Sequence, residues 1–199
     1  VYNYETDNAD YVHGNIDGAI KITNYMGLLL REQWDIEDGE SEEWEQTRGW
    51  YEWVKRDSHL RYVTDINEYL SDIKDERYTV FVATKGEIND TLNENAAMKI
   101  YDLGVKSDLL GEFQNSYVAV IGDKIVENMS SDSASNAGLL NRGRISYEVC
   151  STGDTCTIKI NGVEYAKQSE GLNLVIYNNI TERVIDSVII GNDEESVIR

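Results

Sequence analysis

The sequence predicts an α+β fold, in which an antiparallel β-sandwich carries two or three flanking helices. Strand-like segments separated by short turns follow one another in the last third of the chain, at 143–151, 155–161, 172–178 and 183–190. Two amphipathic helical patterns alternate with β-branched runs in the middle. The 199 residues are enough for one well-buried core, and we expect a single domain overall.

Residues 1–60 are expected to form an irregular segment of strand and helix packed on the core. Residues 17–23 alternate as a strand does, and the apolar run 24–30 fits either a strand or a buried helix. A helix is predicted to start near Ser41, because the acidic residues after it suit the helix dipole. The tryptophans here are either a platform for sugar rings or anchors packed on the core: Trp44, Trp50 and Trp53.

Residues 61–128 begin with a predicted helix. The pair Thr64-Asp65 can cap it, and its apolar residues recur at i, i+3, i+4 and i+7, namely Ile66, Tyr69, Leu70 and Ile73. The run 78–84 is rich in β-branched and aromatic residues and predicts a strand.

A second helix is predicted over 92–103. Thr91 and Glu94 match a capping box, and Gly104 stands where a helix commonly ends. Residues 116–121 and 124–126 then predict a strand pair or one bent strand.

A polar linker is predicted at 129–141, because serine, aspartate and asparagine dominate that stretch. The four-strand segment 142–199 follows it. Within this segment, Cys150 and Cys156 bracket a turn at Gly153, so a hairpin could set the two sulfurs opposite each other. We therefore predict a disulfide and an oxidising compartment, with two free thiols as the alternative.

Three glycosylation sequons, at Asn89, Asn128 and Asn179, are weak further support for export. Calcium is the one ligand that the acidic composition suggests, since hard cations prefer carboxylate oxygens. A candidate loop offers Asp35, Glu37, Asp38 and Glu40, although its spacing does not match a calcium-binding motif.

The charge balance excludes one large class of partners. The chain has 37 acidic and 18 basic residues, a formal net charge of −19, which disfavours nucleic acid and anionic membranes. No apolar run approaches the ~20 residues of a membrane span. Neither His13 nor His59 lies in a protease or zinc motif, and no glycine-rich nucleotide motif occurs. We therefore expect no enzymatic activity and no cofactor.

Two blocks of the sequence carry a family resemblance. Residues 156–165, 170–177 and 183–187 resemble the first half of the interleukin-like EMT inducer (FAM3) domain, with Gly-Leu-Asn at 171–173. The other block resembles the second half of that domain. It contains, in the order of the family, a helix, a strand, an Ala-rich helix and a strand ending in Ile-Gly, at 66–73, 78–84, 92–104 and 113–122.

The two halves stand in reversed order. Either the domain is circularly permuted and completes itself within the chain, or residues 142–199 give strands to a neighbouring subunit. The resemblance implies a secreted β-sandwich without catalysis, in some members lectin-like. Three polar positions of the family pattern differ in this chain. The arginine before Gly-Leu-Asn is Glu170, the arginine of a Phe-Arg pair is Gln114, and residues 85–87 stand in place of the paired acids after the first strand. These replacements argue against inherited glycan binding.

These observations favour a non-enzymatic exported module, extracellular or on the cell surface, that acts through protein–protein contacts. Its partners would be other surface proteins or copies of itself, and it could be a repeating structural subunit with strand exchange. The alternative is a carbohydrate-binding module associated with a membrane glycosyltransferase, which would use Trp44, Trp50 or Trp53.

Overall fold

The computed structural model describes residues 2–3, 7–8, 14–34, 41–88, 92, 94–111, 115–191 and 197–199. The chain divides into two compact units, Val1–His59 and Leu60–Arg199, rather than the single domain that the sequence predicts. The boundary lies close to the predicted end of the N-terminal segment at residue 60.

Two long helices make up most of the first unit. Helix α1 (Ile16–Trp34) begins after Asn15, whose side-chain oxygen accepts the backbone N–H of Gly18 at 3.0 Å. Helix α2 (Glu42–Leu60) begins after Ser41, whose hydroxyl accepts the N–H of Trp44 at 3.2 Å. The predicted strand at 17–23 is therefore wrong, because a capped helix continues through that short alternating stretch.

The second unit contains a five-stranded antiparallel sheet with the strand order β3-β2-β1-β8-β9. Its strands are β1 (Tyr78–Lys85), β2 (Ser116–Ile121), β3 (Ile125–Ser130), β8 (Gly171–Asn178) and β9 (Arg183–Ile190). The predicted strands at 78–84, 116–121, 172–178 and 183–190 are confirmed within a residue or two.

A four-stranded antiparallel sheet with the order β4-β5-β6-β7 packs on the first sheet. Its strands are β4 (Ala134–Leu140), β5 (Ile145–Ser151), β6 (Cys156–Ile160) and β7 (Val163–Glu164), and the short helix η1 (Asn141–Gly143) joins β4 to β5. The predicted linker at 129–141 is wrong, because 134–140 pair with β5 along their whole length. Tertiary pairing outweighs the low strand propensity of Ala, Ser, Asn and Gly.

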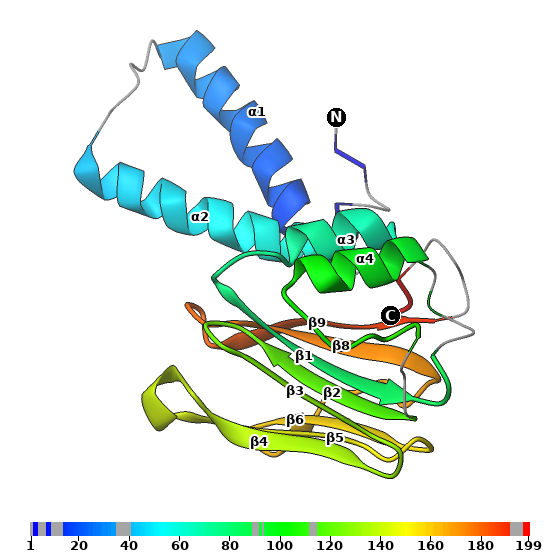
Figure 1. The fold of residues 1–199 in the computed structure, drawn as a ribbon. Coiled ribbons are helices and arrows are strands. Elements are labelled where there is room, and N and C mark those ends of the chain that lie inside the picture. The colour runs from blue at the N-terminus through cyan, green and yellow to red at the C-terminus, as the bar shows by residue number, and fades with distance from the viewer. Residues whose placement is uncertain are drawn as a thin grey trace. The chain divides into compact units, whose positions relative to one another are not determined.

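Two helices cover the other face of the five-stranded sheet (Figure 1). Helix α3 (Ile66–Asp72) is capped by Asp65, which accepts the N–H of Glu68 at 2.8 Å. Helix α4 (Glu94–Asp102) lies within the predicted range, while Thr91 of the expected capping box lies outside the described residues. The second unit therefore has three layers: helices, five-stranded sheet and four-stranded sheet.

The three inner strands of the five-stranded sheet, β2, β1 and β8, are buried on both faces, and alternating side chains fill two different cores. In β1, Val80 and Val82 join the core under the helices, while Phe81 and Ala83 join the core between the sheets. Alternate residues of a strand point to opposite faces, so a continuous apolar run suits a middle layer.

Strands from the two halves of the sequence pair directly. All eight residues of β1 pair with β8 of the same chain, from Tyr78 opposite Asn178 to Lys85 opposite Gly171. Both cores accordingly contain residues from 78–121 and from 142–190. The middle and the tail of the polypeptide thus share one folded unit.

Glu127 ties β3 to the loop after α4, and this tie predicts a pH dependence of stability. Its carboxylate accepts the N–H groups of Lys106 and Ser107 at 3.0 and 3.1 Å and the hydroxyl of Tyr117 at 3.1 Å. Burial acts to raise the pKa of Glu127, but these hydrogen bonds outweigh it and hold the pKa below its ordinary value. The ionised form is therefore the one that the folded state prefers.

We expect Glu127→Gln to be less stable than the natural chain near neutral pH. The stabilisation is complete above the unfolded pKa of glutamate, about 4.3, and is lost as the pH falls through the lower folded pKa. Urea unfolding near pH 7 and near pH 3 measures how much unfolding free energy the Glu127→Gln variant loses relative to the natural chain. We expect this loss to be smaller near pH 3. The exposed Glu148→Gln is the control, and an equal Glu127→Gln difference at both pH values would contradict the assignment.

Candidate functional site

This structure contains no disulfide between Cys150 and Cys156, because the register of the hairpin differs by one residue from the one that would set them opposite each other. Cys150 lies opposite Thr157, and Cys156 lies opposite Ser151. Neighbouring pairs point to opposite faces of a sheet, so the two sulfurs lie on different sides. Both cysteines are free thiols.

The two thiols differ in surroundings. Cys156 lies in the core between the sheets, where burial, together with the charge of Glu164, raises its pKa to about 11. A thiol with such a pKa is a poor nucleophile at neutral pH. Cys150 is half-buried and points toward the outer face of the four-stranded sheet.

The three tryptophans of α2 are exposed, so they are not anchors packed on the core. Trp44, Trp50 and Trp53 leave 66, 55 and 37% of their surface open. A helix turns about 100° per residue, which sets Trp44 and Trp53 about 180° apart. Trp44 therefore does not share a platform with Trp53, whereas Trp50 and Trp53 are three residues apart and lie on neighbouring positions of one helix face. Carbohydrate binding stays a prediction.

The other predicted site residues fall partly outside the described residues. The calcium candidates Asp35, Glu37, Asp38 and Glu40 lie there, as do Asn89 and His13. Asn128 is exposed on β3, and its side-chain amide donates to the carbonyl of Ser135 at 3.3 Å. Asn179 is half-buried in the turn after β8, where its side chain accepts the hydroxyl of Thr79 at 3.0 Å.

The outer face of the four-stranded sheet holds a hollow of about 880 Å³. The carboxylate of Glu148 and the ammonium of Lys159 lie 3.8 Å apart in its lining. The lining also includes small residues, namely Ser135, Ala137, Gly138, Ser146, Cys150 and Gly162. Sequence reasoning missed this face because it assigned 129–141 to a linker. The alternation of small residues in that stretch was the available signal.

Helix α1 exposes a row of large apolar side chains that sequence reasoning also missed. Ile22 and Met26 stand one turn apart and leave 51 and 48% of their surface open. Leu29, which is half-buried, follows Met26 on the same side of the helix. All residues of α1 are described, and Gly18 is the one that is buried. The spacing of 22, 26 and 29 in the apolar run was the available signal.

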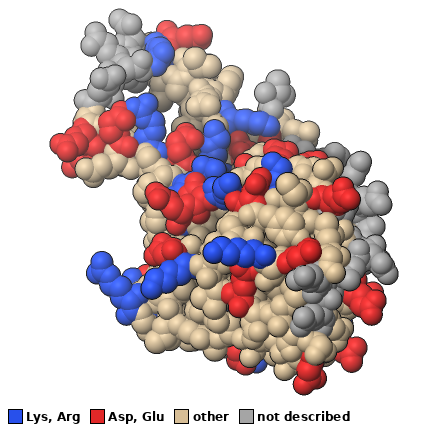
Figure 2. Space-filling view, viewed as in Figure 1, with Lys and Arg blue, Asp and Glu red and all other residues tan. Residues whose placement is uncertain are grey.

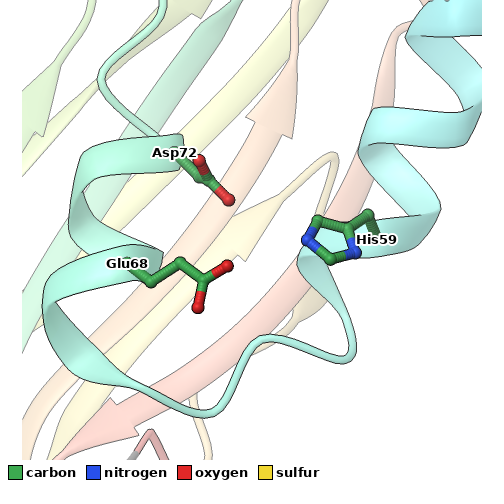
Figure 3. Close-up of side chains that lie close together, drawn as sticks. All are labelled: His59, Glu68 and Asp72. Atoms are coloured by element: carbon green, nitrogen blue, oxygen red, sulfur yellow. The ribbon is translucent and has the colours of Figure 1, made fainter.

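No metal centre is assigned. Glu68 and Asp72 lie one turn apart on α3, and His59 ends the first unit (Figure 3). Exposed pairs of carboxylates are common without a metal ion.

Comparisons with protein-family models, with curated proteins and with solved structures find no match to this chain. The resemblance to the interleukin-like EMT inducer domain therefore stays a prediction. Among the described residues, no helix combines the length and the apolar character that crossing a membrane requires.

Proposed function

We propose that this chain is a non-enzymatic module that acts outside the cell or on its surface through protein–protein contacts, and that its main partner is a second copy of itself. The observation that carries the proposal is the exposed apolar row on α1, formed by Ile22, Met26 and their neighbours. Most of the stability of helices in proteins comes from packing of an apolar face against another surface. A covering partner would supply that packing.

The charges of α2 favour a second copy as this partner. Its first turn is acidic, with Glu42, Glu43 and Glu45, whereas Lys55 and Arg56 stand near its end. An antiparallel copy would bring the acidic start of one helix beside the electrically balanced end of the other, where Lys55 and Arg56 stand next to Glu52 and Asp57. Such an arrangement offsets part of the repulsion between two chains of net charge −19.

Export is supported by the sandwich-like architecture of the second unit. The free thiols Cys150 and Cys156 give it no support. The absence of nucleotide and protease motifs in this sequence supports a role without catalysis.

The double substitution Ile22→Gln with Met26→Gln is expected to weaken self-association about tenfold or more, because each side chain contributes about 1 kcal/mol at a packed contact. Light scattering coupled to size exclusion, over a series of concentrations, measures the mass. Leu28→Gln is the matched control, since Leu28 is 57% exposed but lies about 120° around the helix from Ile22.

A natural chain that stays monomeric at every concentration would contradict the proposal. Equal weakening by Leu28→Gln would show that the effect is not specific to the row. Circular dichroism of each variant verifies that α1 keeps its helical content.

A further inference from the structure

Strand β4 (Ala134–Leu140) presents an open edge of backbone hydrogen-bonding groups. It pairs with β5 on one side, and no other strand in the described part of the chain pairs with its second side. The Ser135 carbonyl accepts a long hydrogen bond of 3.3 Å from Asn128. Unpaired N–H and C=O groups along a strand form a template for another strand.

The other sheet edges carry features that oppose such pairing. β7 has two residues. The edge of β9 is partly covered by other segments. Its residue Ile189 exchanges backbone hydrogen bonds of 2.8 and 3.0 Å with Ile198, and Arg61 donates to the carbonyl of its residue Ile185 at 2.8 Å. β3 carries the charged Glu127.

β4 has none of these features. Its seven residues include no charged side chain, its register with β5 is continuous, and the chain contains no proline. Natural proteins use charges, bulges and prolines to block edge pairing, so their absence marks β4 as the edge that is open to a partner strand.

We propose that β4 pairs antiparallel with the β4 of a second copy, so that two four-stranded sheets become one continuous sheet. This interface uses a different surface from the helical contact of the proposed function and goes beyond it. The same patch serves both copies, as in most two-fold symmetric dimers.

The charges that flank β4 support a second copy as the occupant. Asp132 precedes the strand and Arg142 follows it, each five residues from Ala137, and both are exposed. A two-fold axis at Ala137 brings the turn that holds Asp132 to the same end of the paired strands as the turn that holds Arg142 of the partner subunit, and this occurs twice. Arg142 lies beyond the end of β4 with a φ of +59°, so the contact would be made by its long side chain and not by continued strand pairing. Two acidic proteins could thus meet at a site that is locally neutral and complementary.

The side chains fit this register. Ala137 faces its own counterpart, where a small residue lets the strands approach. Leu139, which is 64% exposed, faces Ser135 of the partner subunit and gains cover. The lower part of the surface, where β4 lies in Figure 1, is mostly tan, with Lys and Arg prominent at the left margin and Asp and Glu in scattered clusters (Figure 2).

Ala137→Lys tests the pairing in the full chain. Two lysines would face each other across the axis, and we expect the dimer dissociation constant to rise at least about tenfold. Ser146→Lys is the matched control, because Ser146 is exposed on the same face but belongs to β5. Analytical ultracentrifugation measures the association, and thermal unfolding verifies that both variants fold.

A charge exchange tests the register. Asp132→Arg and Arg142→Asp should each weaken the dimer, and the double variant should regain it. Asp154→Arg, in the exposed turn between β5 and β6, changes the net charge by the same amount as Asp132→Arg and should leave association unchanged. A double variant as weak as the single variants would overturn this register.

The outcomes separate the two interfaces. Association that Ile22→Gln with Met26→Gln abolishes but Ala137→Lys leaves intact would overturn β4 pairing and keep the proposed function. The reverse result would keep β4 pairing and overturn the helical contact. A chain that is monomeric throughout would overturn both.

Discussion

Replacing Phe81 with alanine is expected to lower the free energy of unfolding of the second unit by about 3–5 kcal/mol. Phe81 is completely buried between the two sheets, and the centroid of its ring lies 5.3 Å from the ring centroid of Tyr147. The substitution leaves a cavity in a core that the neighbours can only partly fill. Because whole domains are stable by about 5–15 kcal/mol, this is a large share of the total.

The measurement is urea and thermal unfolding of the full chain, with a fall in Tm of about 10–20 °C. Phe81→Leu, which keeps most of the volume, should cost about 1.5 kcal/mol or less. Amide exchange of β5 and β6 should accelerate together with that of β1, since Phe81 and Tyr147 belong to one core. If Phe81→Ala unfolds like the natural chain, the core shared by the middle and the tail is refuted.

The sequence predicted most of the sheet strands because their apolar runs and turns are local signals. The β-branched run of β1 and the regularly spaced strands after residue 142 were recognised in this way. The pair Thr64-Asp65 likewise marked the start of α3, since a cap acts through a local hydrogen bond, and the structure shows that Asp65 makes it with the N–H of Glu68.

Other features depend on pairing between distant residues and could not be read locally. β4 is a strand because 134–140 pair with β5. The register of the β5–β6 hairpin decides that Cys150 and Cys156 point apart, and a shift of one residue would have reversed this outcome. Composition favoured a linker at 129–141, and the placement of the two cysteines around a turn favoured a disulfide.

The candidate surfaces were missed for a related reason. The exposed row of Ile22 and Met26 on α1 looks in sequence like an ordinary buried stretch, since apolar spacing shows which face is apolar but not what covers it. The tryptophans of α2 show the same ambiguity. Aromatic residues are usually buried, yet Trp44 is 66% exposed.

Gly171→Ala is the second substitution with a large expected effect. Gly171 begins β8 with a φ of +114°, a conformation that is strained for any side chain. A Cβ there would lie 2.6 Å from the carbonyl oxygen of Ile190 and 3.0 Å from the Cα of Gly191, and both are backbone atoms. The clash cannot be relieved by turning a side chain, so β8 and β9 must separate or shift.

We therefore expect Gly171→Ala to cost about 2–4 kcal/mol of unfolding free energy, from backbone strain together with the lost pairing of Leu172 with Ile190. Gly162→Ala is the matched control: its φ is +78°, but the added Cβ meets open space, so strain alone should cost about 1–2 kcal/mol. Urea unfolding measures the loss of unfolding free energy in each variant, and the difference between the two losses gives the cost of the clash. Equal losses would contradict the close approach of β9 to Gly171, and with it the pairing that closes this end of the five-stranded sheet.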